Sequence, residues 1–390
     1  MENKMYISDN VKYVGVNDKK IDLFEGQYHV PLGISYNSYV IIDEKVAVID
    51  SVGEDFGEEW LKCIEGQLGD RCPDYIVIQH MEPDHSANLT LFTEKYPMAK
   101  VVASQKAFSM MQQFFGCDLS ERSLTVGDGD VLSLGEHTLK FYTAPMVHWP
   151  EVIMSYDEKD KILFSADAFG KFGALDTDDE WACEARRYYI GIVGKYGAQV
   201  QSLLKKLSGA DIKIICPLHG PVLSEDLGYY IGLYDTWSSY RPEERGVLIA
   251  YASIYGNTRR AAELLAERLT SLGCEKVALC DLARDDIHEA FEDAFRYSAL
   301  VLASATYNGD IFPPMKAFID GLVERNYQKR AVGFIENGTW APVAAKKMRS
   351  MLESSRDIAF MDTGVRILSA VNDKSIAEID KLANEILSAY

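Results

Sequence analysis

The sequence predicts two α/β-type domains in series, the first with two sheets flanked by helices and the second with a doubly wound parallel sheet. Hairpin-like strand runs separated by helical stretches fill the chain up to residue 245. A polar segment with a proline, Arg241-Pro242-Glu243-Glu244-Arg245, then follows as a linker would. From residue 246 onward, strand and helix patterns alternate regularly. The predicted domains are therefore residues 1–245 and 246–390.

The first domain mixes antiparallel strands with helices, which is typical of an α+β arrangement. Its strand runs alternate in hydrophobicity or are compactly apolar and end in turn residues. Strands are predicted over residues 39–50 (two strands around a turn), 75–79, 131–143 and 152–165 (a hairpin each), and helices over residues 56–68 and 184–207.

The second domain contains five strand–helix pairs in 145 residues. This repetition favours a doubly wound parallel sheet, in which ligands bind at the carboxyl ends of the strands. The strands are predicted at 246–251, 277–280, 300–304, 330–336 and 365–368, and the helices at 259–272, 287–297, 315–324, 343–354 and 375–389.

The composition is that of an ordinary globular protein, with 47% apolar and 25% charged residues. No apolar run approaches the ~20 residues that span a bilayer, and the polar start of the chain has no signal-peptide core. We therefore expect a cytoplasmic protein. The net charge of −19 argues against nucleic acid or an anionic membrane as a partner.

The cysteine pattern argues against a disulfide framework, a zinc ribbon or a built-in four-cysteine iron site. The number of cysteines is odd and no two form a C-x-x-C pair. The seven are Cys63, Cys72, Cys117, Cys183, Cys216, Cys274 and Cys280.

The strongest local signal for a metal site directly follows the predicted strand at residues 75–79. The hexamer His80-Met81-Glu82-Pro83-Asp84-His85 offers four nitrogen or oxygen ligands. On an extended chain alternate side chains point the same way, so His80, Glu82 and Asp84 can converge, and a turn at Pro83 can bring in His85.

Three more potential ligands, His148, Asp167 and His219, lie where other predicted strands give way to loops. Together the four imidazoles and three carboxylates suffice for two metals that share one bridging carboxylate. Ligation by imidazole and carboxylate without thiolate suits iron, and also zinc or manganese.

These seven residues resemble the ligands of the metallo-β-lactamase superfamily. The hydrolases of that superfamily usually carry H-x-H-x-D-H, whereas Glu82 replaces the second histidine here, which resembles the flavodiiron branch. The resemblance implies a metallo-β-lactamase-like αββα sandwich and two non-haem irons. It assigns His80, Glu82 and His148 to one iron, Asp84, His85 and His219 to the other, and Asp167 to the bridge. The loop after Asp176 is shorter than is usual in that family.

The first loop of the second domain resembles the phosphate loop of flavodoxins, commonly [ST]-x-[TY]-G-x-T. In Ser253-Ile254-Tyr255-Gly256-Asn257-Thr258, the hydroxyls of Ser253 and Thr258 can bind phosphate oxygens. Gly256 lets the backbone approach, and the N-terminus of the following helix favours an anion. The loop lacks G-x-G-x-x-G, so FMN is favoured over FAD or NAD.

Two later loops lie at the ends of the third and fourth strands of the second domain. Their aromatic residues Tyr307 and Trp340 are candidates to flank a flat flavin ring. The predicted flavin-binding residues are Ser253, Tyr255, Gly256, Asn257, Thr258, Thr306, Tyr307, Asn308, Asn337, Gly338 and Trp340.

Iron and flavin together imply redox chemistry. By resemblance, the protein reduces dioxygen to water, nitric oxide to nitrous oxide, or both. The alternative is a dimetal hydrolase, such as a thioesterase or lactonase, fused to a flavodoxin domain; Glu82 and the flavin loops speak against it. A third interpretation is an electron-transfer protein with a vestigial metal site, which the complete ligand set disfavours.

The same resemblance implies partners. Because the sequence contains no rubredoxin-like four-cysteine module, we expect a separate electron donor such as rubredoxin or a similar small redox protein. We also expect a head-to-tail homodimer or a dimer of dimers, with the flavin of one chain facing the irons of the other. His29 and Tyr196 are candidates for groups near the substrate.

Overall fold

The computed structural model describes residues 6–116 and 119–389 and divides into two compact units. The first unit holds the chain up to Tyr188 together with Ala198–Asp235, and the second holds Tyr189–Gly197 and the chain from Thr236 onward. The Arg330 guanidinium donates to the carbonyl oxygens of Tyr240 and Tyr297, both at 2.7 Å, and so ties the connecting segment to the second unit.

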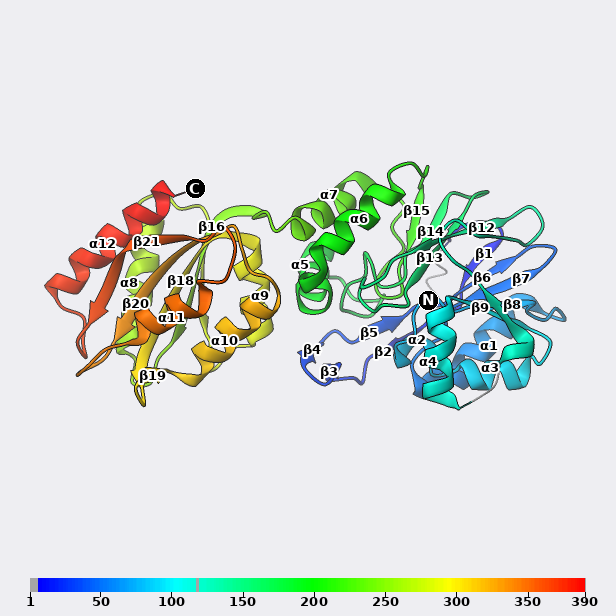
Figure 1. Cartoon of the computed structure of the whole chain (residues 1–390), viewed down its shortest axis with the longest axis horizontal. Helices are drawn as coiled ribbons and strands as arrows, with labels where there is room; N and C mark the ends of the chain where they lie inside the picture. The colour runs from blue at the N-terminus through cyan, green and yellow to red at the C-terminus, as the bar shows by residue number, and fades with distance from the viewer. Residues whose placement is uncertain (1–5, 117–118, 390) are drawn as a thin grey trace. The chain divides into compact units, whose positions relative to one another are not determined.

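Two sheets form the centre of the first unit (Figure 1). Apolar side chains from both sheets, such as Tyr39 and Phe164, share one buried core. The first sheet has the order β1 (Val11–Tyr13), β6 (Tyr39–Ile42), β7 (Val46–Ile49), β8 (Tyr75–Val77), β9 (Lys100–Ala103) and β10 (Ser123–Thr125). The second has the order β11 (Val131–Ser133), β12 (Thr138–Thr143), β13 (Ile153–Asp157), β14 (Ile162–Phe164) and β15 (Ile214–Cys216).

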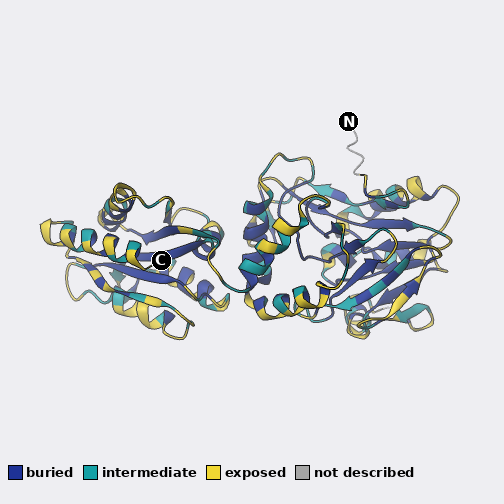
Figure 2. Ribbon diagram, turned by 90° about the horizontal axis from the view of Figure 1, so that it is seen from above, coloured by how far each residue is buried: buried dark blue, intermediate teal, exposed yellow. Residues whose placement is uncertain are grey.

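Helices cover the outer faces of these sheets, which gives the predicted αββα sandwich (Figure 1). Figure 2 shows the buried strands inside and the exposed helix faces outside. On the side of the first sheet lie α1 (Gly57–Leu68), α3 (Leu89–Lys95) and α4 (Gln105–Phe115), and on the side of the second lie α5 (Trp181–Tyr188), α6 (Gly197–Leu207) and α7 (Leu227–Ser238). Two small ribbons pair β2 (Val16–Asp18) with β5 (Ile34–Tyr36) and β3 (Leu23–Phe24) with β4 (Tyr28–His29).

The stretch predicted as helical over residues 184–207 is helical, but it is not one regular α-helix. Helix α5 ends at Tyr188, a π-helical turn (Tyr189–Val193) and a 3-10 turn (Gly194–Tyr196) follow, and α6 begins at Gly197. Glycines at 191, 194 and 197 each weaken a helix by about 1 kcal/mol relative to alanine. At Gly197 a Cβ would stand 2.3 Å from the carbonyl oxygen of Ser238, so this close approach requires glycine.

The second unit is built on a five-stranded parallel sheet with one short antiparallel strand at its edge. When the parallel strands are numbered along the chain, they lie in the sheet in the order 2-1-3-4-5, which is the flavodoxin-like order. The strands are β17 (Val277–Asp281), β16 (Glu244–Ala252), β18 (Tyr297–Tyr307), β20 (Ala331–Asn337) and β21 (Ala359–Ile367), with β19 (Asp310–Ile311) beside β18. The helices are α8 (Asn257–Ser271), α9 (Ile287–Arg296), α10 (Pro313–Glu324), α11 (Ala344–Leu352) and α12 (Asp373–Ser388). The predicted doubly wound sheet is confirmed.

Within the described residues, no helix is both long and apolar enough to cross a membrane. The six cysteines among them are all free thiols, and Cys117 lies outside the described residues.

Candidate metal centre and flavin site

The loops at the carboxyl ends of four strands bring the seven candidate ligands together. His80 follows β8, His148 follows β12, Asp167 follows β14 and His219 follows β15. Strand β12 runs antiparallel to β13 and β13 antiparallel to β14, while β14 and β15 are parallel, so β12, β14 and β15 end at one edge of their sheet. The topology thus collects residues that are distant in sequence.

The hexamer that begins at His80 changes conformation at Pro83. Glu82 is still extended, with φ −59° and ψ 139°, whereas Pro83 starts the four-residue helix α2 (Pro83–Ser86) that carries Asp84 and His85. Proline suits the first helical position because its missing N–H has no partner there anyway. Asp84 therefore lies with His85, not with His80 and Glu82 as alternation along a strand would have it.

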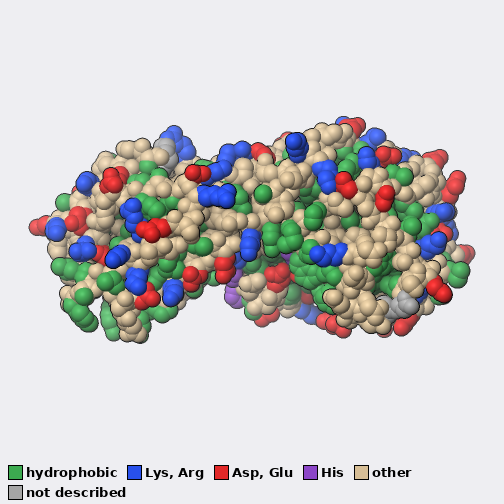
Figure 3. Space-filling model, in the orientation of Figure 1, with side chains coloured by type: hydrophobic (Ala, Val, Ile, Leu, Met, Phe, Trp, Pro, Cys, Tyr) green, Lys and Arg blue, Asp and Glu red, His purple; other side chains and the backbone are tan. Residues whose placement is uncertain are grey.

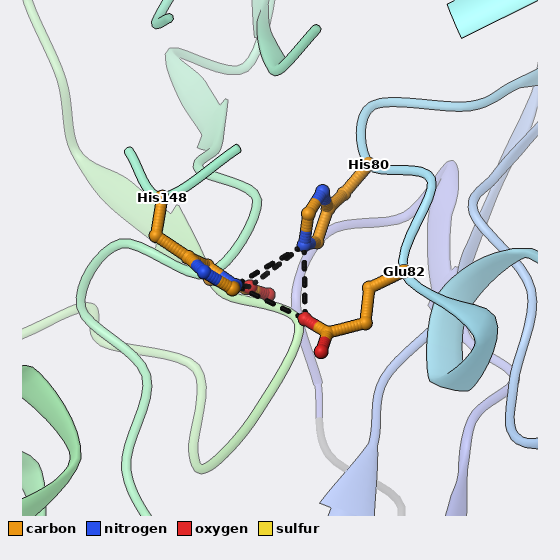
Figure 4. Close-up of side chains that lie close together, drawn as sticks. His80, Glu82 and His148 are labelled. Carbon is orange, nitrogen blue, oxygen red and sulfur yellow. Dashed lines mark hydrogen bonds and ion pairs between the residues drawn. The ribbon is translucent and has the colours of Figure 1, made fainter. Parts of the chain in front are cut away.

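The first ligand group consists of His80, Glu82, His148 and Asp167 (Figure 4). His80 Nε2 lies 3.2 Å from a Glu82 oxygen and 3.3 Å from His148 Nε2. His148 Nε2 lies 3.0 Å from both Glu82 and Asp167 Oδ2. Figure 4 shows the labelled side chains pointing toward one another, those of His80 and Glu82 from one loop and that of His148 from another.

The second ligand group consists of Asp84, His85 and His219. The Nε2 atoms of the two histidines are 3.0 Å apart, and they lie 3.2 and 3.3 Å from Asp84 Oδ2. Asp167 reaches this group too, because its Oδ1 lies 3.4 Å from His85 Nε2 while its Oδ2 faces the first group. One carboxylate thus offers one oxygen to each group.

These contacts fit metal ligation better than hydrogen bonding. Both oxygens of Asp84 and of Asp167 are buried without a hydrogen-bond partner among the described residues. Unsatisfied buried carboxylates are costly, and two Nε2 lone pairs at 3.0 Å repel each other unless a cation or proton lies between them. Ligand atoms at about 2.1 Å from an ion stand about 3.0–3.4 Å apart, as these do.

The charges around the site support the same interpretation. Burial lowers the pKa of His148, but the carboxylates of Asp167 and Glu82 beside its ring raise that pKa by more, to about 9. Burial favours a raised pKa for Asp167, yet the neighbouring imidazoles of His80 and His148 hold that pKa well below its usual value. A metal ion needs the neutral imidazole of each histidine ligand, so metal binding weakens as pH falls.

Sequence reasoning missed two buried residues around this centre. Glu151 Oε1 accepts from the His80 ring at Nδ1 (2.9 Å) and from the Met81 backbone N–H (2.9 Å). The Tyr188 ring lies 5.5 Å from the His219 ring, and its buried hydroxyl has no hydrogen-bond partner among the described residues. A carboxylate three residues after His148 was an available signal for Glu151, whereas nothing in the sequence marked Tyr188.

The two predicted substrate neighbours are His29 and Tyr196. The His29 side chain is exposed on β4, and its carbonyl oxygen accepts from Arg187 at 2.8 Å. Tyr196 belongs by its contacts to the second unit. Their roles near the substrate stay predictions.

A cavity of about 470 Å³ opens at the carboxyl ends of the strands of the second unit. One wall is formed by the loop from Ser253 to Thr258, where Gly256 has φ 91° and no side chain caps helix α8. Ser253 Oγ accepts from the Gly256 N–H at 3.1 Å, which holds the loop in shape. The open helix N-terminus and the two hydroxyls form a cradle that suits a phosphate.

The remaining walls come from the loops after β18, β20 and β21. Trp340 is 81% exposed, so its ring is free to cover a flat ligand. Of the predicted flavin residues the cavity is lined by Ser253, Tyr255, Asn257, Thr258, Thr306, Asn308, Asn337, Gly338 and Trp340. Sequence reasoning missed Ile254, Ala305, Gly309, Thr339, Ala341 and Ser369, which also line it.

Two predicted flavin residues have other roles in the structure. The Tyr307 ring packs on Phe312 at 5.5 Å and lines a neighbouring hollow instead of this cavity. The Thr306 hydroxyl accepts from the N–H groups of Val343 (3.0 Å) and Ala344 (3.3 Å), so it caps helix α11. Of the two aromatic candidates, Trp340 remains at the cavity, which Tyr255 also lines.

The fold and the two sites define a class of protein, a β-lactamase-type metal domain followed by a flavodoxin-type domain. The family model of the ODP family beta lactamase matches residues 34–220, and that of the flavodoxin domain matches residues 248–365. The nitric oxide reductase of Moorella thermoacetica is 30% identical over 368 residues, which are 91% of each chain. The rubredoxin oxygen:oxidoreductase of Desulfovibrio gigas superposes with a TM-score of 0.92 at 26% identity, covering 99% of this chain and 98% of that one. The flavodiiron protein of Giardia intestinalis gives 0.87 at 27%, covering 100% and 98%.

The chain belongs to the flavodiiron protein family. The family sets its cofactors, FMN and non-haem iron, and both sites described above have the residue types that these cofactors require.

Proposed function

We propose that this protein reduces dioxygen to water, nitric oxide to nitrous oxide, or both, at a diiron centre supplied with electrons by FMN. The observation that carries the proposal is the pair of adjoining ligand groups with Asp167 between them, one oxygen toward each. Two of the similar proteins are named for nitric oxide and for oxygen respectively, which supports both substrates.

The ligand roles follow the two groups. His80, Glu82 and His148 would hold one iron and Asp84, His85 and His219 the other, with Asp167 offering one oxygen toward each group. When bound, two ferrous ions and reduced FMN supply four electrons for one dioxygen, or two electrons for two nitric oxide molecules. The buried hydroxyl of Tyr188 beside this centre is placed to donate a hydrogen bond to a substrate oxygen.

The second unit binds FMN in its cavity. Ser253 and Thr258 hold the phosphate with the first turn of α8, and Trp340 covers the ring. The two cofactors therefore belong to different proposed domains, iron to residues 1–245 and FMN to residues 246–390.

Electrons arrive from a separate carrier, for which rubredoxin or a similar small redox protein is the proposed class. The name of the Desulfovibrio gigas protein includes rubredoxin, which supports this choice. On the face shown in Figure 3, acidic and basic side chains are interspersed, so the net negative charge is not gathered there into one patch that would select a partner by charge alone. Because electron transfer falls steeply with distance, we propose a head-to-tail homodimer, alone or as a dimer of dimers, in which each flavin faces the irons of the other chain. A cytoplasmic location remains a prediction from the sequence.

Metal analysis tests the proposed function against the hydrolase. The purified protein should contain about two irons per chain and little zinc, because imidazole and carboxylate ligands suit iron and the chain belongs to the flavodiiron protein family. Mainly zinc, together with thioester or lactone hydrolysis, would establish the hydrolase instead.

A further inference from the structure

The histidines of the two ligand groups differ in what holds the ring nitrogen that faces away from the metal position. In the first group, His80 Nδ1 lies 2.9 Å from a carboxylate oxygen of Glu151. In the second group, His219 Nδ1 lies 2.7 Å from the neutral carbonyl oxygen of Ser35, and His85 Nδ1 is buried without a hydrogen-bond partner among the described residues. A carboxylate therefore accepts a hydrogen bond from a histidine of the first group, whereas the described residues show no carboxylate in that role for His85 or His219.

Glu151 is held rigidly in this role. Its side chain has no exposed surface, and Oε1 also accepts the backbone N–H of Met81 at 2.9 Å. Its own carbonyl oxygen accepts from the Ser104 hydroxyl at 2.8 Å. Because a carboxylate only accepts hydrogen bonds, the Nδ1 atom of His80 must carry the proton, and the lone pair of Nε2 then faces the metal position.

We propose that Glu151 is a positioning residue that fixes His80 in its ligating form and makes the iron position of His80, Glu82 and His148 the tighter of the two. This inference rests on the diiron centre of the proposed function. A carboxylate that accepts from a ligating imidazole orients the ring and raises its basicity, and losing such a partner typically costs about 10–100-fold in metal affinity. The carbonyl behind His219 is a weaker acceptor because it carries no charge.

The chain offers a matched control in a second buried carboxylate–imidazole pair of the same unit. His137 Nδ1 lies 3.0 Å from Asp157 Oδ2, and both side chains are fully buried. Neither residue belongs to the two ligand groups around Asp167, and together with Asp160 they form a separate, third group of potential ligands. Replacing Asp157 therefore reports the structural cost of breaking such a pair without touching the metal centre.

The test is a titration of the metal-free, FMN-bound protein with Co²⁺, followed by absorption in competition with a chelator. The wild-type chain should take up two ions in two steps of different affinity. Glu151→Ala should weaken the tighter step by about 10–100-fold and leave the other nearly unchanged. Glu151→Gln keeps an acceptor but removes the charge, so its affinity in the tighter step should lie between those of the wild-type chain and Glu151→Ala. Asp157→Asn should leave the affinities of both steps unchanged.

A His219→Ala chain identifies which step belongs to which position. It should retain the tight step alone, and adding Glu151→Gln should weaken that remaining step. Retained FMN and an unchanged circular dichroism spectrum verify folding, and the Gln variant is the decisive one if the Ala variant does not fold.

Two results would overturn the inference: equal affinities for the two ions in the wild-type chain, or Glu151 variants that behave as Asp157→Asn does. These readouts need no turnover. If they come out as expected and the iron-loaded protein reacts with neither dioxygen nor nitric oxide, the proposed function fails and the asymmetry of the centre stands.

Discussion

Asp167 offers one oxygen to each ligand group, at 3.0 Å from His148 and 3.4 Å from His85. Replacing it with alanine removes a ligand from both positions at once. We expect Asp167→Ala to lose most of its iron and to lose turnover by more than the 10–100-fold that removal of even an outer partner costs. FMN should stay bound, because its cavity belongs to the other unit. Iron analysis beside a flavin absorption spectrum checks this, and retention of both iron and turnover would mean that Asp167 is not the bridge.

The His137–Asp157 pair gives a pH dependence of stability that is independent of the metal. Burial lowers the pKa of His137, but the hydrogen bond to Asp157 and the charges of Asp157 and Asp160 raise it by more, against a small opposing effect of Lys159. A raised pKa stabilises the fold fully below the unfolded value of about 6.5, and this contribution is lost as pH rises through the folded value.

The wild-type chain should therefore exceed Asp157→Asn in free energy of unfolding by an amount that shrinks as pH rises above about 6.5 through the raised pKa of His137. Urea unfolding of the two proteins at each pH measures this difference. A difference that stays constant across that range would show that His137 carries no extra proton in the folded protein.

At the residue level, the sequence predicted the metal site best where a potential metal ligand directly follows an apolar strand. His80, His148, Asp167 and His219 each follow an apolar strand, so both their type and their place pointed to a shared site. Glu151 and Tyr188 could not be recognised in the same way, because one follows a proline in a loop and the other ends a helix. Their importance comes from partners that only the fold brings near, namely His80 for Glu151 and His219 for Tyr188.

At the element level, the regular βα repeats of the second domain were predictable, because each strand run and each helix stretch buries its own apolar face. The segment after α5 was not. Its glycines at 191, 194 and 197 interrupt a helical hydrophobic pattern, and the reason for Gly197 lies in a close approach to Ser238 that the sequence does not reveal. The same limit explains Thr306, whose hydroxyl caps a helix that starts 38 residues later.

The loop between β16 and α8 is the element that should set flavin affinity. Replacing both Ser253 and Thr258 with alanine removes two hydroxyl partners of the phosphate, each worth about 1.5 kcal/mol or more when the acceptor is charged. FMN should then bind at least about 100-fold more weakly, since 1.4 kcal/mol is a factor of ten. Iron content should not change.

Ser271→Ala provides the control, since that serine ends the same helix and its hydroxyl donates to the Arg268 carbonyl oxygen on the surface. Flavin titration of the apoprotein measures the affinities. Equal affinity in the double variant and the wild-type chain would place the phosphate away from this loop.

At the scale of the whole molecule, the proposed head-to-tail dimer makes two inactive chains complement each other. One variant lacks iron through Asp167→Ala, and the other lacks FMN through the changes at Ser253 and Thr258. A mixed dimer joins the intact flavin of one chain to the intact irons of the other, so co-expression should restore part of the activity that neither variant has alone. Mixed dimers that form and stay inactive would mean that each chain works with its own flavin.

The proposed function requires that two irons and one FMN act together on dioxygen or nitric oxide. Anaerobic stopped-flow mixing of the fully reduced protein with dioxygen, and separately with nitric oxide, tests this directly. We predict that at least one of the two gases reoxidises both FMN and iron within a single turnover, with water or nitrous oxide as the product. Reduced flavin and ferrous iron that persist after mixing with either gas would contradict the proposed function.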